Sequence, residues 1–258
     1  MPSSERADLE HALTGTLERV RQAGKILDFW WRDDDAVSQT AALDRLLGQA
    51  DRFGVPLVLA VIPEPAEPGL FSRIADTGGV TVSQHGFAHR NHEPPSEKKT
   101  ELGAARAADL VLDELARGRD ILTERAGSLF APILTPPWNR IAPDIAERRI
   151  EIGLTGLSTY GPTGADPHQV NTHVDMIDWH GGRGFIGWDR VTAMLQKEID
   201  RRLAGRNEPI GLLTHHLVHD EETWAFLDAF LSLTSDHPAA RWQDPPTLFG
   251  LTAETLPD

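Results

Sequence analysis

The sequence contains no cysteine in its 258 residues. This absence excludes disulfides, cysteine-ligated zinc sites and thiolate nucleophiles, so any bound metal must rest on imidazole and carboxylate ligands. Long apolar runs are also missing, because no segment approaches the roughly 20 residues of a membrane-spanning helix. We therefore expect no membrane partner.

Positive charge is scarce, with 25 Lys and Arg residues against 39 Asp and Glu residues. The formal net charge of −14 repels phosphate backbones, so we expect no nucleic-acid partner. Residues 1–24 predict an amphipathic helix without the apolar segment of a secretory signal. Its apolar stripe is Leu9, Leu13, Leu17 and Val20. We expect a cytoplasmic protein with a helical extension over residues 1–24 and a single domain over residues 25–258.

Strand-like and helix-like apolar patterns alternate along the chain. Strands are predicted at 26–31, 57–62, 80–82, 129–134 and 210–213, with weaker ones at 154–158 and 170–176. Helices are predicted at 40–52, 97–125, 144–152 and 191–199, and a final helix carries Trp224, Leu227, Phe230 and Leu231. This α/β alternation predicts a mostly parallel sheet, for which a barrel and an open doubly wound sheet both fit.

Five polar clusters stand at or just past the carboxyl ends of predicted strands. They read "RDDDA", "HGFAH", "TPPWNR", "DMIDWH" and "LLTHHLVHD". Enzymes built on parallel sheets collect their catalytic groups at this edge, so the clusters predict one functional site.

The first two clusters have the composition of a metal site. The adjacent carboxylates Asp33, Asp34 and Asp35 repel one another, and a solvated loop or a helix cap is the ordinary explanation of such a run. A divalent cation would relieve that repulsion and leave a neighbouring carboxylate free to act as a base. His85 and His89 are four residues apart, a spacing that turns both rings to one side on a tight turn. Two partly exposed loop histidines remain the alternative.

The other clusters supply aromatic and acid–base groups. Pro136 and Pro137 would fix Trp138 as a rigid wall, although a plain strand exit explains them equally well. "DMIDWH" places Asp175 and Asp178 beside Trp179. His215 and His216 are adjacent, so at most one of them can face inward from a strand.

Taken in order, these clusters resemble the polysaccharide deacetylase family, the NodB-homology domain of carbohydrate esterase family 4, over about residues 29–220. The resemblance implies a distorted (β/α) barrel of about seven parallel strands, a divalent metal and hydrolysis of an N-acetyl or related amide. It assigns these roles: general base Asp34, metal ligands Asp35, His85 and His89, general acid His215, orienting carboxylate Asp178, and Trp138 as a wall of the pocket. We also expect Trp179 and Arg32 to contact the substrate, Trp179 because it flanks a polar strand end. Zinc is the first choice of metal, and iron, cobalt or manganese would also suit two imidazoles and a carboxylate.

The chain departs from the family pattern at three places. Asp33 adds a third carboxylate, so Asp33 and Asp34 could hold the base and ligand roles instead, and His216 could replace His215. Gly86 stands where the family commonly has Ser or Thr, whose hydroxyl would brace the loop. Thr135 stands where the family usually has the arginine that orients the base, a role that Arg32 or Arg140 could take over.

The predicted function is that of a metal-dependent hydrolase of a carbon–nitrogen bond. The metal would leave positions open for water and the substrate carbonyl, Asp34 would accept a proton from the water, and His215 would protonate the leaving amine. The expected partner is a small, neutral or cationic N-acylated substrate, in the first place an N-acetylated sugar or short oligosaccharide. Two alternatives stay open: a non-catalytic metal- or carbohydrate-binding domain of the same fold, and a metal-independent glycoside hydrolase using Asp34 and Asp178. No feature of the sequence indicates whether the protein is a monomer or an oligomer.

Overall fold

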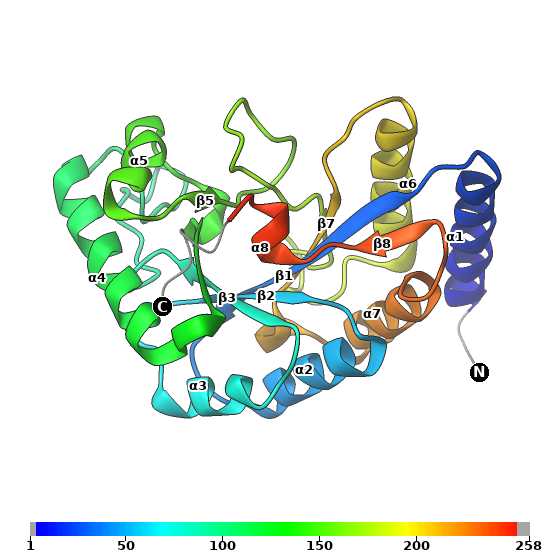
Figure 1. The fold of residues 1–258 in the computed structure, drawn as a ribbon, viewed down its shortest axis with the longest axis horizontal. Helices are drawn as coiled ribbons and strands as arrows, with labels where there is room; N and C mark the ends of the chain where they lie inside the picture. The colour runs from blue at the N-terminus through cyan, green and yellow to red at the C-terminus, as the bar shows by residue number, and fades with distance from the viewer. Residues whose placement is uncertain (1–3, 252–258) are drawn as a thin grey trace.

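A parallel sheet of eight strands forms the centre of the molecule, within residues 4–251 that this computed structural model describes. The strands are β1 (Leu27–Ala36), β2 (Leu57–Val61), β3 (Val80–His85), β4 (Phe130–Thr135), β5 (Gly156–Leu157), β6 (Val174–Asp175), β7 (Ile210–Thr214) and β8 (Ala240–Trp242). Their order is β5-β4-β3-β2-β1-β7-β6, and β8 pairs with the start of β1. Figure 1 shows this sheet curled, with helices around its outer side. The predicted distorted (β/α) barrel is confirmed.

The surrounding helices follow the strands in sequence. Those described are α1 (Ser4–Gln22), α2 (Ala41–Phe53), α3 (Pro68–Ala75), α4 (Ala108–Ala126), α5 (Pro143–Arg148), α6 (Trp188–Leu203), α7 (Glu221–Thr234) and α8 (Pro245–Leu248). The helix α1 packs against α6 and α7, at the right of Figure 1, and buries the predicted stripe of Leu9, Leu13, Leu17 and Val20. No helix among the described residues is long and apolar enough to cross a membrane.

Side chains of β1 alternate between two apolar clusters. Phe29 and Trp31 belong to the main core between the sheet and the helices, whereas Trp30 belongs to a smaller cluster. That smaller cluster joins β1, β2 and β4 to Phe249 beyond α8, so it lies on the concave side of the curled sheet. Trp30 and Trp31 are therefore both core residues, and they belong to different clusters because successive residues of a strand point to opposite faces.

The strand β1 is longer than predicted and contains the acidic run. Arg32 and Asp33 keep parallel register with β2 and β7, so the strand continues to Ala36 instead of ending near residue 31. The register shifts between Asp33 and Ala36, and Asp35 has a φ of 72°. Such a bulge bends the strand and re-aims the side chains at its end. Asp35, which the sequence predicts to be a metal ligand, is thus placed where regular alternation breaks.

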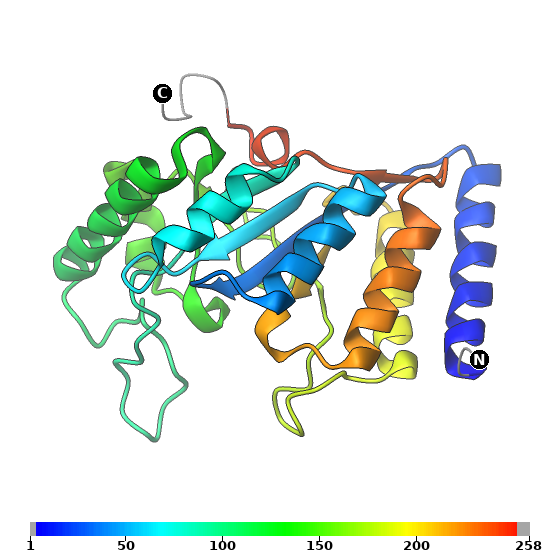
Figure 2. The ribbon, with the colours of Figure 1, turned by 90° about the horizontal axis from the view of Figure 1, so that it is seen from below.

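One predicted helix is wrong in its first third. Residues 97–107 form an irregular segment, and α4 begins only at Ala108. Leu102, which fitted the helical pattern, is buried because it bridges to Ile141 and accepts a hydrogen bond from the Ala142 amide. Figure 2 shows the loop that contains this segment and the loop that leads into α6 projecting from the same side of the molecule. Residues 1–3 of the predicted N-terminal helix and 252–258 of the predicted domain lie outside the described residues.

Candidate metal centre

Asp35, His85 and His89 meet at the carboxyl ends of β1 and β3. One ligand atom from each side chain lies within 4.8 Å of the other two. The Nε2 atoms of His85 and His89 are 3.0 Å and 3.3 Å from the same Asp35 Oδ1. Two imidazoles and one carboxylate that converge in this way match the donor set of zinc, iron and related divalent metals.

The second nitrogen of His85 is held by the backbone. His85 Nδ1 lies 2.9 Å from the carbonyl oxygen of Thr135, which can only accept a hydrogen bond. A neutral His85 therefore carries its proton on Nδ1 and directs the lone pair of Nε2 at Asp35. Two acceptors facing each other at 3.0 Å require either a second proton or a cation between them. The residues present thus fit a divalent metal, and the carbonyl supplies the orientation that metal-bound histidines usually have.

The charge states of the three groups follow from their surroundings. Burial alone would raise the pKa of Asp35, but the hydrogen bond and charge of His85 outweigh it and lower that pKa. Burial opposes protonation of His85, whereas the charges of Asp34 and Asp35 raise its pKa overall. Burial and the neighbouring His85 lower the pKa of His89, which favours the neutral imidazole that binds metals.

Asp34 is paired with Arg32 on the same face of β1. The Arg32 guanidinium donates from Nε to Asp34 Oδ1 at 2.8 Å and from Nη2 to Oδ2 at 3.0 Å. It also donates to Ser158 Oγ at 2.6 Å and to Asn139 Oδ1 at 2.7 Å. Arg32 is 0% exposed and Asp34 is 2% exposed, so this bidentate pair lies in the protein interior. The burial of Arg32 argues against its predicted contact with substrate.

Asp33 points to the opposite side of β1. Its carboxylate lies 2.5 Å from His216 Nδ1 and accepts hydrogen bonds from the Thr214 hydroxyl and the His216 amide. Burial would raise the pKa of Asp33, but the charge of His216 lowers it, and the same pairing raises the pKa of His216 against the effect of burial. Asp33 and His216, the alternative site residues considered from the sequence, therefore contact each other. Neither joins the three convergent ligand atoms of Asp35, His85 and His89.

His215 stands on the side of the site opposite His85. Its Nε2 lies 3.9 Å from Asp34 Oδ2, and its ring packs edge-on against Trp179 at 4.6 Å between centroids. Trp179 donates from Nε1 to Asp175 Oδ2 at 2.8 Å. Burial raises the pKa of Asp175, and the charge of His215, which acts in the opposite direction, does not outweigh that effect. Asp175 therefore holds the Trp179 ring that packs against His215.

The predicted orienting carboxylate, Asp178, is placed differently. Its Oδ1 accepts a hydrogen bond from the Gly181 amide, and its Oδ2 lies 3.8 Å from Arg190 Nη1. Among the described residues no hydrogen bond joins it to His215. Both aspartates of "DMIDWH" accept a nearby backbone amide, but only Asp175 also accepts from Trp179, the ring that packs on His215. The spacing alone could not separate them, because Asp175 ends the two-residue strand β6 and the chain from Met176 to Asp178 follows no regular period.

No family model matches the chain, and no curated protein matches it by sequence. Solved structures match it by fold. A Mycobacterium smegmatis protein provisionally called a polysaccharide deacetylase aligns over 83% of this chain and 78% of its own, with a TM-score of 0.60 and 18% identity. PdaA of Bacillus subtilis, a family 4 carbohydrate esterase, aligns over 93% and 89%, with a TM-score of 0.55 and 15% identity. A family 4 acetyl xylan esterase of Clostridium thermocellum, solved with a cobalt ion, aligns over 87% and 93%, with a TM-score of 0.52 and 13% identity. The chain has the polysaccharide deacetylase fold.

Within this polysaccharide deacetylase fold, one of the two arginines predicted as substitutes for the arginine missing at Thr135 lies against Asp34. Arg32 reaches Asp34 from two residues earlier on β1, whereas Arg140 donates from Nη1 to the Lys99 carbonyl. Of the two arginines considered from the sequence, Arg32 is the one that contacts Asp34. Thr135 contributes its backbone carbonyl to His85 instead.

Aromatic side chains flank the Asp35–His85–His89 cluster. Trp138 has a φ of 55° and packs against the His89 ring at 4.4 Å between centroids, in a short 3-10 helix after β4. Trp179 is 39% exposed on the other side. The two predicted substrate contacts therefore border the site from two different loops.

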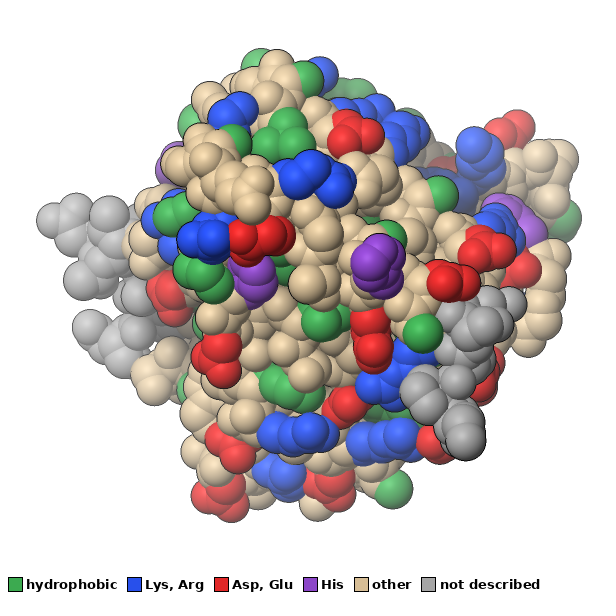
Figure 3. All heavy atoms as spheres, turned by 90° about the vertical axis from the view of Figure 1, so that its right-hand side faces the viewer, with side chains coloured by type: hydrophobic (Ala, Val, Ile, Leu, Met, Phe, Trp, Pro, Cys, Tyr) green, Lys and Arg blue, Asp and Glu red, His purple; other side chains and the backbone are tan. Residues whose placement is uncertain are grey.

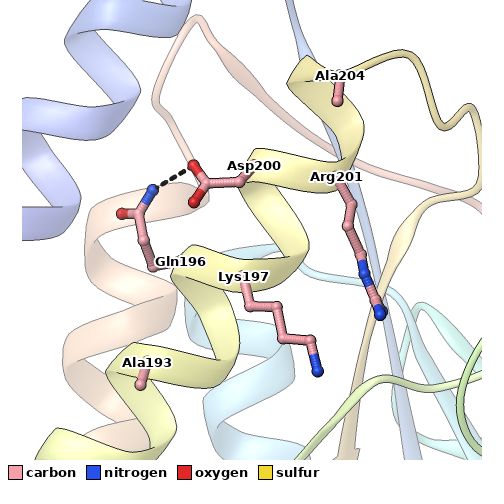
Figure 4. A pocket seen from close by; sticks show the side chains of 6 residues that line it. All are labelled: Ala193, Gln196, Lys197, Asp200, Arg201 and Ala204. Carbon is pink, nitrogen blue, oxygen red and sulfur yellow. Dashed lines mark hydrogen bonds between the residues drawn. The ribbon is translucent and has the colours of Figure 1, made fainter.

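Other hollows of the surface lie apart from this centre. One hollow, of about 610 Å³, is lined by residues of α6 and by Ala204 directly after it. Figure 4 shows Gln196 and Asp200 pointing toward each other there, joined by a hydrogen bond. Figure 3 shows acidic and basic side chains interspersed over the described part of the face around α1, rather than a continuous basic patch. None of Asp35, His85 and His89 lines the hollow on α6.

Proposed function

We propose that this protein is a metal-dependent hydrolase that removes the acetyl group from a small N-acetylated sugar or short oligosaccharide. The observation that carries the proposal is the convergence of Asp35, His85 and His89, with Asp34 and His215 beside them. Structures of the same fold add support, since they include family 4 carbohydrate esterases, one of them solved with cobalt and another with acetate.

Each side chain has a role that its geometry permits. Asp35, His85 and His89 would hold a divalent cation, with zinc as the first choice, which when bound would supply Lewis-acid polarisation of the substrate carbonyl. Asp34, held by Arg32, would accept a proton from the attacking water. His215, whose Nε2 lies 3.9 Å from Asp34 Oδ2, would then protonate the leaving nitrogen.

Arg32 would act by positioning Asp34. A bidentate guanidinium fixes both oxygens of a carboxylate, which neither lysine nor a single hydrogen bond achieves. Trp138 and Trp179 would supply flat apolar surfaces for a sugar ring, and the surrounding carboxylates would disfavour anionic substrates. Asp175, rather than Asp178, would position His215 indirectly, by holding the Trp179 ring that packs against it.

Metal content and acetate release together test the proposal. Purified protein should contain about one divalent metal per chain, and it should release acetate from N-acetylglucosamine or its short oligomers in a chelator-sensitive manner. His85→Ala and His89→Ala should each lose the metal while keeping the fold, which rests on apolar burial. His92→Ala, which changes an exposed histidine of the adjacent loop, is the matched control and should keep it.

The alternatives give different results. A glycoside hydrolase should cleave glycosidic bonds regardless of chelator, and a binding domain should retain metal or sugar without releasing acetate. Full metal retention in both histidine variants would exclude this site.

A further inference from the structure

Glu101 is a buried carboxylate directed at the loop between His85 and His89. It is 1% exposed and belongs to the irregular segment that precedes α4. Its Oε2 accepts from the Phe87 amide at 3.0 Å, and its Oε1 accepts from the Ala88 and Arg90 amides at 2.8 Å and 3.4 Å. A buried carboxylate needs such donors, and charge-assisted hydrogen bonds to it are stronger than neutral ones.

The glycine after His85 makes this contact possible. Gly86 has a φ of 59°, and a Cβ atom there would clash with the Glu101 carboxylate and come within 2.6 Å of Pro137 Cγ. Glu101 therefore occupies the space beside the backbone where a side chain at position 86 would begin. Position 86 has no hydroxyl side chain to brace the loop, and the carboxylate of Glu101, from the segment before α4, lies in that place instead.

We infer that Glu101 is a positioning residue of the metal centre. By holding three amides of the loop, it fixes the turn in which His89 adopts a φ of 54° and brings its Nε2 to 3.3 Å from Asp35 Oδ1. Without that acceptor the amides must find water, and the loop relaxes away from the geometry that aligns the two imidazoles. The inference rests on the proposed metal-binding function and adds a residue to it.

Glu101→Gln is the informative substitution, because it keeps the size of the side chain but removes its charge and replaces one acceptor oxygen with a donor. We expect zinc affinity, measured by competition with a chromophoric chelator, to fall by about 10- to 100-fold, as for other groups that orient metal ligands. Hydrogen exchange of the amides at 87, 88 and 90 should become faster in the metal-free protein. Glu101→Asp, which keeps the charge on a shorter stem, should fall between Glu101→Gln and the wild type in affinity.

Glu208→Gln is the matched control. Glu208 also accepts from a loop amide, that of Thr163, but it precedes β7 at the end of the sheet away from the site. We expect this variant to bind zinc as the wild type does, with the melting temperature of each metal-free protein recorded alongside.

The outcomes separate the two ideas. Wild-type zinc affinity in Glu101→Gln, or an equal loss of affinity in Glu208→Gln, overturns the role of Glu101 and leaves the proposed function standing. If Glu101→Gln does not fold, wild-type affinity in Glu101→Asp overturns it in the same way. A wild-type protein that binds no divalent metal overturns the proposed function and this role with it.

Discussion

The buried pair of Arg32 and Asp34 predicts a specific pattern of stability losses. Arg32→Met keeps much of the side-chain volume but leaves the carboxylate of Asp34, which is 2% exposed, without its counter-charge. Removing one partner of a buried ion pair costs about 3–5 kcal/mol of unfolding free energy. In a chain of this size, that loss corresponds to a decrease in melting temperature of roughly 6–20 °C.

A double variant separates the stranded charge from the other contacts of Arg32. Arg32→Met combined with Asp34→Asn also loses the hydrogen bonds to Ser158 and Asn139, but it buries no unpaired carboxylate. We expect it to be more stable than Arg32→Met alone by about 2 kcal/mol, because the uncompensated charge accounts for most of the cost of breaking such a pair.

Urea unfolding at pH 7, followed by tryptophan fluorescence on chelator-treated protein, measures these differences. Arg52→Met is the surface control, since Arg52 pairs with Asp228 at 2.7 Å while its side chain is 64% exposed. An exposed pair of this kind contributes about 1 kcal/mol or less. Equal losses in Arg32→Met and Arg52→Met, or a double variant no more stable than the single one, would refute the reasoning.

Three more outcomes follow from the structure. Asp175→Asn should reduce acetate release far more than Asp178→Asn, because Asp175 holds the Trp179 ring that packs against His215, whereas Asp178 contacts Gly181 and Arg190; the reverse ranking would restore the assignment made from the sequence. Burial and Arg202 lower the pKa of His173 from 6.5 to about 4. As the pH falls, this imidazole is therefore protonated in the unfolded chain before it is protonated in the folded one, and the free energy of unfolding should fall by roughly 3 kcal/mol between pH 6.5 and 4. Urea midpoints at both pH values should show a smaller fall in His173→Asn, and an unchanged fall would contradict this account. The pKa of His216 is raised, so its stabilising contribution is complete below pH 6.5 and is lost as the pH rises through the raised value. The stability advantage of wild type over His216→Asn should therefore shrink between pH 6 and 9, and a constant advantage would count against the ion pair.

The strands that the sequence predicted best are those whose residues are buried on both faces. All five residues of β2 and of β7 are buried, and such strands form near-continuous apolar runs. The two-residue strands β5 and β6 gave only weak signals, and the short, half-exposed β8 gave none. Residues 97–107 misled the prediction because Leu102 satisfied a helical period while its burial comes from a bridge to Ile141. Local patterns cannot distinguish these two origins of an apolar residue.

The candidate site shows the same division. Asp35, His85 and His89 were predicted because metal ligands leave a spacing in the sequence. Side chains that contact them from elsewhere in the chain leave no such spacing: Glu101 reaches the loop after His85 from a segment that was predicted to be helical. The contact of Asp175 with Trp179 depends likewise on the irregular chain that follows the two-residue strand β6. Arg32 was considered as a substitute for the missing arginine, but only the register of β1 decided between it and Arg140.

The course of β1 explains how three consecutive aspartates are accommodated. Alternation sends Asp33 to the outer side, where His216 neutralises it, and Asp34 to the concave side, where Arg32 lies two residues earlier on the same face. A regular strand would return Asp35 to the side of Asp33 and bring two carboxylates together. The bulge and the φ of 72° prevent this by turning Asp35 toward the histidines, in a left-handed conformation that aspartate tolerates better than most residues. One irregular residue therefore converts a repulsive run into three carboxylates, each with its own partner.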